Sequence, residues 1–119
     1  MPIKIISSSA STSGLLPKGP VSAPLSDPAC QVSSLDVAFD ESCACTTGLW
    51  ECSPGSFRRA VAGGEVMHIL TGKGSFQPDE GPMIRFQAGD TLFFPPKPMG
   101  SGVSKTPFAR STWLCRRLR

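Results

Sequence analysis

The sequence has 119 residues and a mass of 12.6 kDa, which is the size of one domain. It contains 18% charged and 39% hydrophobic residues, the balance of a folded globular chain rather than a disordered one. Twelve glycines and twelve prolines, spread along the chain, exclude coiled coils and membrane-spanning helices of about 20 apolar residues. The net charge of +3 is too small to indicate a nucleic-acid partner.

The charges are unevenly distributed. Five acids and no base lie between Lys18 and Arg58, whereas six bases and no acid follow Asp90. We expect these two segments to attract each other within the chain or across a dimer. An anionic partner for the basic C-terminal tail is the alternative.

The first part of the chain is rich in Ser and Pro. Residues 1–35 carry too few apolar side chains to form a core, so we expect an irregular N-terminal arm, draped over the body or over a neighbour. The apolar run near the start is shorter than a signal peptide requires, which predicts a cytoplasmic protein. In that compartment the five cysteines would remain thiols. Zinc binding by Cys43, Cys45 and Cys52 is a weaker alternative, because a second pair of ligands is missing.

From residue 36 to the end at 119, short apolar runs alternate with turn residues, which predicts one all-β barrel domain without long helices. Short antiparallel strands in a single small domain must pair or close their edges, and this favours a barrel over an open sheet. The expected strands are 48–53, 57–61, 66–70, 75–77, 83–87, 91–94 and 110–115.

Two turns with their flanking strands resemble the two motifs of a cupin. Glu65-Val-Met-His-Ile-Leu-Thr-Gly72 fits the Glu-x6-Gly end of the first motif, and Gly89-Asp-Thr-Leu-Phe-Phe-Pro95 fits the Gly-x5-Pro start of the second. Together with Gly48-Leu-Trp-Glu-Cys52 and Pro54-Gly-Ser-Phe57, they make residues 46–115 similar to the small single-domain cupins of the ureidoglycine aminohydrolase type. The resemblance implies an RmlC-like jelly-roll barrel with an interior pocket, commonly a homodimer.

The usual cupin metal ligands are a His-x-His pair, the Glu and a later His. Counting from the motifs places Arg59 and Val61, or Arg58 and Ala60, at the first pair and Gly100 at the last position. Only Glu65 remains as a candidate ligand, and one carboxylate does not hold a first-row metal. We therefore expect no transition metal and no other cofactor, although the aminohydrolase that the chain resembles is metal-dependent.

The resemblance implies that the Glu65 carboxylate points into the barrel, and strand alternation then suggests which other side chains share that interior. If Phe57, Arg59 and Val61 share the inward orientation of Glu65, then Arg59 and Glu65 form a charge-assisted hydrogen bond inside the barrel. The pair is either part of an anion-binding or acid–base pocket or a structural ion pair. The candidate ligand-binding residues are Glu65, Arg59, Trp50, Phe57 and Met67.

Catalytic residues are not indicated. The same alternation turns His68, the only histidine, outward with Val66 and Leu70, and the chain has no Tyr to serve as the acid of a metal-free epimerase. The strand aromatics can line a pocket, but their ordinary role is core packing. They are Trp50, Phe57, Phe76, Phe86, Phe93, Phe94 and Trp113.

The predicted function is the binding of a small polar or anionic metabolite in the barrel, without a transition metal. The alternative is an enzyme resembling ureidoglycine aminohydrolase that acts on a ureido or amide compound. The expected partners are a small-molecule ligand and a second copy of the chain, with no nucleic acid and no membrane. The arm and the face carrying Val66, His68 and Leu70 are expected to pack against that second copy.

Overall fold

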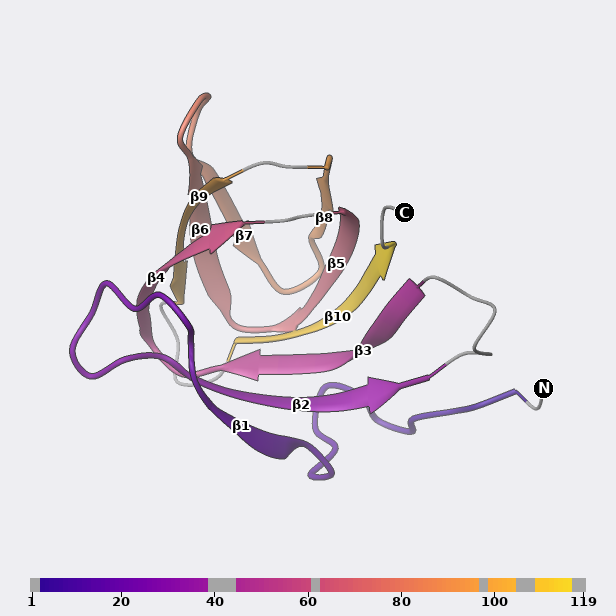
Figure 1. The fold of residues 1–119 in the computed structure, drawn as a ribbon. Helices are drawn as coiled ribbons and strands as arrows, with labels where there is room; N and C mark the ends of the chain where they lie inside the picture. Colours follow the sequence, from indigo (N-terminus) through magenta and orange to yellow (C-terminus); the bar gives the residue numbers. More distant parts are fainter. Residues whose placement is uncertain (1–2, 39–44, 61–62, 97–98, 105–108, 117–119) are drawn as a thin grey trace.

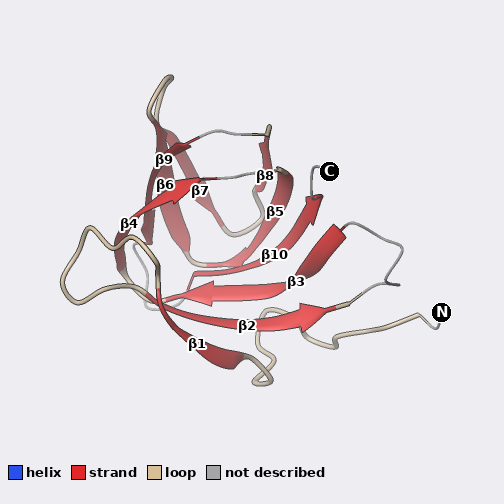
Figure 2. Cartoon of the chain, viewed as in Figure 1, coloured by secondary structure: helices blue, strands red, loops and turns tan. Residues whose placement is uncertain are grey.

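A computed structural model of the chain describes residues 3–38, 45–60, 63–96, 99–104 and 109–116. These residues form ten β-strands and no helix (Figure 1, Figure 2). The described part of the chain thus offers no helix that could cross a membrane. The strands are β1 (Leu16–Pro20), β2 (Gln31–Val37), β3 (Cys45–Cys52), β4 (Gly55–Ala60), β5 (Gly64–Thr71), β6 (Lys73–Pro78), β7 (Ile84–Gln87), β8 (Thr91–Phe94), β9 (Met99–Ser104) and β10 (Ala109–Arg116).

The strands lie in two antiparallel sheets. One has six strands in the order β1-β2-β3-β10-β5-β8, and the other has four in the order β4-β9-β6-β7. Figure 1 shows the sheets curving around a common interior, with β1 and β2 extending one edge of the larger sheet. The chain passes repeatedly from one sheet to the other, which is typical of a jelly roll. The all-β jelly-roll barrel expected from the sequence is confirmed.

All seven expected strands are present, with ends that differ by three residues or fewer. The prediction of a wholly irregular arm at residues 1–35 is wrong, because β1 pairs with β2 and β2 pairs with β3. The boundary expected after residue 35 falls inside β2. Strand β2 is stabilised by backbone hydrogen bonds to the edge of β3, even though most side chains of β2 are polar. The arm is therefore partly an extension of the larger sheet.

The turn between β7 and β8 follows from its residues. Gly89 has a φ of 97°, a conformation that glycine adopts without steric strain. The backbone N–H of Gln87 donates to the Asp90 carboxylate at 2.9 Å, and the Asp90 N–H donates to the Gln87 carbonyl at 3.0 Å. This closed turn carries the chain from β7 in the four-stranded sheet to β8 in the six-stranded sheet, where β8 pairs with β5.

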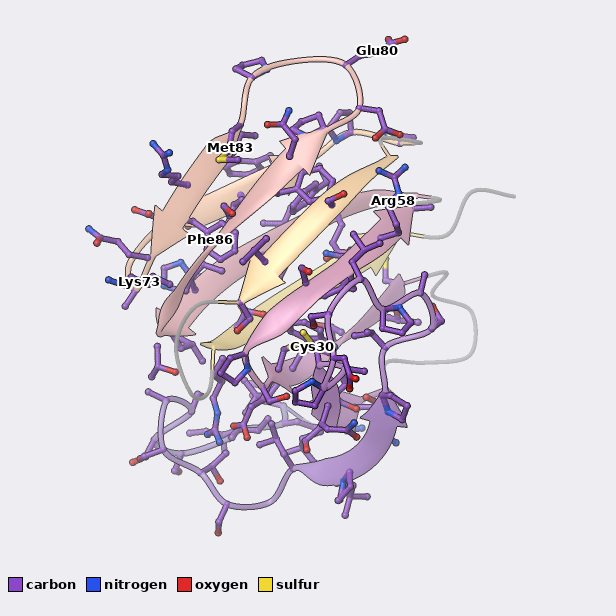
Figure 3. The ribbon with its side chains drawn as sticks, turned by 90° about the vertical axis from the view of Figure 1, so that its left-hand side faces the viewer. Cys30, Arg58, Lys73, Glu80, Met83 and Phe86 are labelled. Atoms are coloured by element: carbon purple, nitrogen blue, oxygen red, sulfur yellow. The ribbon has the colours of Figure 1, made fainter. Side chains whose placement is uncertain are left out.

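The core lies between the two sheets. It contains Met67, Ile69, Phe76, Leu92 and Phe94, each at most 8% exposed, with Phe86 packed against them. Phe76 and Phe94 come from opposite sheets and meet edge to face, with ring centroids 5.2 Å apart. Figure 3 looks onto the four-stranded sheet and shows Phe86 on this side of the molecule. Among the aromatics expected in the core, Phe93 is instead 75% exposed, because it alternates with Leu92 and Phe94 and faces outward on an edge strand.

The N-terminal arm docks on the larger sheet through Arg110. The Arg110 guanidinium donates to the backbone carbonyls of Ser9 and Thr12 at 3.0 and 2.7 Å. The same group forms an ion pair with Glu51 at 2.6 Å, and both side chains are largely buried. Glu51 belongs to the acidic segment of the chain and Arg110 to the basic one. The expected attraction between the two segments is thus confirmed within the chain for this pair.

Candidate functional site

The site centres on an ion pair between Arg59 on β4 and Glu65 on β5. These two strands follow one another in the sequence but belong to different sheets. Along β5, Glu65, Met67 and Ile69 are buried and alternate with half-buried Val66 and His68. This alternation directs Glu65 to the interior, where Arg59 Nη2 lies 2.5 Å from both carboxylate oxygens. The structure therefore brings Arg59 and Glu65 together as expected.

The Arg59 guanidinium is also held by uncharged neighbours. Its Nη1 donates to the sulfur of Met67 at 3.4 Å, and its Cζ lies 5.5 Å from the centroid of the Phe94 ring. The face of an aromatic ring attracts a cation, and Glu65 neutralises the charge at hydrogen-bond distance. The Glu65 and Arg59 side chains are 7% and 28% exposed, so water screens the pair only in part.

A partly open cavity of about 50 Å³ lies next to this pair. Four of the five expected pocket residues contribute to its wall, namely Trp50, Phe57, Arg59 and Met67. Glu65 does not, because its carboxylate is turned to Arg59 at one end of the cavity. The remaining wall comes from both sheets and consists of Ile69, Ser75, Phe76, Phe86, Leu92, Phe94, Gly102, Val103, Ser104, Arg110 and Ser111.

An open apolar groove of about 460 Å³ lies on the other side of the pair. Glu65 lines this groove together with Cys45, Gly64, Val66, Phe93, Phe94 and Pro95. Because Arg59 lines the inner cavity, Glu65 lines the groove and Phe94 lines both, these three residues separate the two spaces. The ion pair thus forms part of a partition between the barrel interior and the outer surface.

The cavity also contains a polar group that the sequence did not reveal. Ser111 on β10 is 2% exposed and lies in register with Trp50 and Ile69, both of which line the cavity. Its hydroxyl has no hydrogen-bond partner among the residues that the structure describes. The missing partner is a property of the packed barrel, so no sequence pattern could have indicated it.

The residues at the cupin metal positions do not fit a metal ion. Arg59 is a cation, and Glu65 already accepts two hydrogen bonds from it. A Cβ atom at Gly100 would overlap the Gln77 carbonyl and approach Phe76 Cζ to 2.7 Å, so the last ligand position has no room for a side chain. Val61 lies outside the described residues. Within the described part, no three His, Cys, Asp or Glu side chains converge on one point.

The other chemistry-bearing residues lie apart from the cavity. His68 faces outward as expected, and its Nδ1 lies 2.8 Å from Thr91 Oγ1. Cys30 and Cys52 are fully buried thiols, and burial raises the pKa of Cys52 to about 12, with a further contribution from the neighbouring Cys30. Cys43 and the side chain of Cys115 lie outside the described residues. A neutral, buried thiol is a poor nucleophile.

Residues 39–114 match the sequence model of the EutQ-like cupin domain, more than half of the chain. The chain belongs to the EutQ-like cupin family. The cupin superfamily expected from the two motifs is thereby confirmed, and the match does not extend to the narrower ureidoglycine aminohydrolase type. No curated protein sequence matches the chain significantly.

Solved structures show the same fold in this cupin and in distant proteins. The EutQ protein of Clostridium difficile is 18% identical, with a TM-score of 0.65 over 80% of this chain and 76% of the other. A protein of unknown function from Pseudomonas syringae pv. tomato is 22% identical, with a TM-score of 0.74 over 84% and 43%. A cupin 2 conserved barrel domain protein from Rhodopseudomonas palustris is 20% identical, with a TM-score of 0.67 over 89% and 72%. At these identities the likeness concerns the fold alone.

Proposed function

We propose that this cupin binds a small polar metabolite, neutral or anionic, inside its barrel and without a transition metal. The observation that carries the proposal is the interior cavity with a buried, unpartnered hydroxyl on its wall. Ligand sites are typically concave and mostly apolar, with a few polar groups that orient the ligand. The interior of the barrel has this composition, because aromatic and aliphatic side chains surround Arg59 and Ser111.

The proposal is tested by filling the cavity. Ile69 is 2% exposed and lines the wall, so the larger side chain of Ile69→Phe would occupy the space. Ile84 is 43% exposed, and Ile84→Phe makes the same chemical change outside the cavity. A library of small polar metabolites is screened against all three proteins by saturation-transfer NMR. Ligands should bind wild type and Ile84→Phe but not Ile69→Phe. Equal binding by the filled variant, with its fold confirmed by its NMR spectrum, would place the site elsewhere.

The alternative is a metal-dependent enzyme of the ureidoglycine aminohydrolase type, acting on a ureido or amide compound. The donor set around Glu65 disfavours it, because metal enzymes present about three or four ligands. Elemental analysis of the purified protein separates the two functions. We expect no stoichiometric transition metal. About one equivalent per chain, lost in Glu65→Ala, would favour the enzyme.

A further inference from the structure

We infer that the inner cavity selects an uncharged ligand of a few atoms that carries one hydroxyl or carbonyl oxygen, bound through the Ser111 hydroxyl. This inference rests on the proposed function and specifies the charge of the ligand, its size and the residue that binds it. Its three supports are the unpartnered Ser111 hydroxyl, the volume of the cavity and the pairing of both charged residues on its wall.

Within the described part of the chain, the Ser111 hydroxyl lacks the hydrogen-bond partner that the buried serines Ser34 and Ser104 have. A buried hydroxyl without a hydrogen bond is unfavourable, and a serine can both donate and accept. Ser104, which also lines the cavity, donates to the Cys52 carbonyl at 3.3 Å, and buried Ser34 donates to Asp36 at 3.1 Å. Among these buried serines, Ser111 alone is left to bond an oxygen that enters the cavity.

The size of the cavity limits the ligand. At roughly 10–15 Å³ per water-sized sphere, the 50 Å³ of the cavity accommodates about three to five such spheres. A ligand with about four non-hydrogen atoms reaches at best a dissociation constant of roughly 40 µM. Binding is therefore expected at millimolar concentrations, and selectivity arises from exclusion rather than from high affinity.

The charged residues of the wall exclude ions. Arg59 is paired with Glu65 at 2.5 Å and Arg110 with Glu51 at 2.6 Å, so neither guanidinium carries an unbalanced charge into the cavity. A carboxylate or ammonium group that enters would lose its hydration without gaining a counter-ion. An uncharged carbonyl or hydroxyl group loses less hydration free energy on entering the cavity, and a hydrogen bond to Ser111 replaces part of that loss.

Acetone and acetate test this inference, because they have nearly the same size and shape but differ in charge. Binding is followed through the methyl NMR signals of Met67 and Ile69, which line the cavity. Acetone should shift these signals saturably in the millimolar range, and acetate should not. Ser111→Ala should weaken acetone binding about three- to tenfold. It should also retain or raise the melting temperature, because it removes an unpaired buried hydroxyl. Ser34→Ala, which removes a bonded serine outside the cavity, should leave acetone binding unchanged.

The outcomes separate this inference from the proposed function. Acetate binding as tight as acetone binding, or acetone binding unaffected by Ser111→Ala, would overturn the inference and leave interior binding intact. Xenon, which needs only apolar space, serves as a third probe. Signals shifted by xenon but not by acetone would likewise overturn the inference. If none of the three probes moved the signals, interior binding itself would be refuted.

Discussion

Arg59 changes what the interior of this cupin can do. It stands where the resemblance places a metal ligand, and its guanidinium brings the positive charge next to Glu65 that a metal would otherwise supply. A guanidinium donates hydrogen bonds and offers no open coordination position, so Arg59 can orient a group by hydrogen bonding but is not itself a Lewis acid.

The ion pair should behave as a buried pair. In Glu65→Leu the guanidinium stays largely buried without its partner, and we expect a loss of about 3 kcal/mol in the free energy of unfolding. Combining Glu65→Leu with Arg59→Leu should restore much of the loss, because two apolar side chains of similar volume avoid the desolvation cost. Urea denaturation of the single and double variants measures both effects. No loss in Glu65→Leu would mean that water solvates the carboxylate.

The exposed pair Arg58–Asp79 provides the control for this experiment. Its atoms are 2.6 Å apart, but the two side chains are 35% and 50% exposed. The hydrogen bond from Arg58 lowers the pKa of Asp79. Water solvates either partner left alone, so Asp79→Leu should cost far less than Glu65→Leu. Figure 3 shows Arg58 at the surface, on the side of the four-stranded sheet.

At the scale of elements, strands with an apolar pattern could be predicted and those without one could not. Strand β9 reads Met-Gly-Ser-Gly-Val-Ser and carries no alternation that indicates a strand. Its conformation comes from β4 and β6, which bond to its two edges. Its glycines admit neighbouring rings, since a Cβ at Gly102 would lie 3.0 Å from Phe57. Such a strand is specified by its partners rather than by its own residues.

The same distinction applies to the site. The cupin resemblance, which orients Glu65, together with alternation along the strand of Arg59 predicted that the two residues meet, and both strands are regular. Ser111 could not be recognised, because its role depends on the absence of a hydrogen-bond partner among groups from distant strands. The partition between cavity and groove is likewise a property of the assembled barrel.

The contact between the arm and β3 should respond to alkaline pH. Burial raises the pKa of Cys52 from 9.0 to about 12, so above pH 9 the unfolded chain releases this proton while the folded chain retains it. The stabilisation that comes from the raised pKa of Cys52 is fully present below pH 9. Above pH 9 the free energy of unfolding should fall by about 1 kcal/mol per pH unit. Urea titrations between pH 8 and 10.5 under reducing conditions measure this slope. The slope should be smaller in Cys52→Ala, and an unchanged slope would assign it to other groups.

For the whole molecule, the homodimer remains a prediction. Val66, His68 and Leu70 form a half-buried outer face of β5, and Phe93 on the adjacent edge strand is 75% exposed. We expect this surface to be covered by a second copy, because small folded chains rarely leave contiguous apolar surface in water. Light scattering should give twice the chain mass for wild type and the single mass for Leu70→Lys. A monomeric wild type would contradict the prediction, and Lys73→Glu is a control on the other sheet.

Gly100 limits what can be engineered into this barrel. In an open site one substitution can introduce a metal ligand, but here the Gln77 carbonyl and the Phe76 ring cover the position. A histidine introduced at position 100 would first have to displace the backbone of β6, and the arginine at position 59 would still repel the incoming cation. A metal-ligand set could therefore be built in this barrel only by changing position 59, position 100 and the path of β6 together.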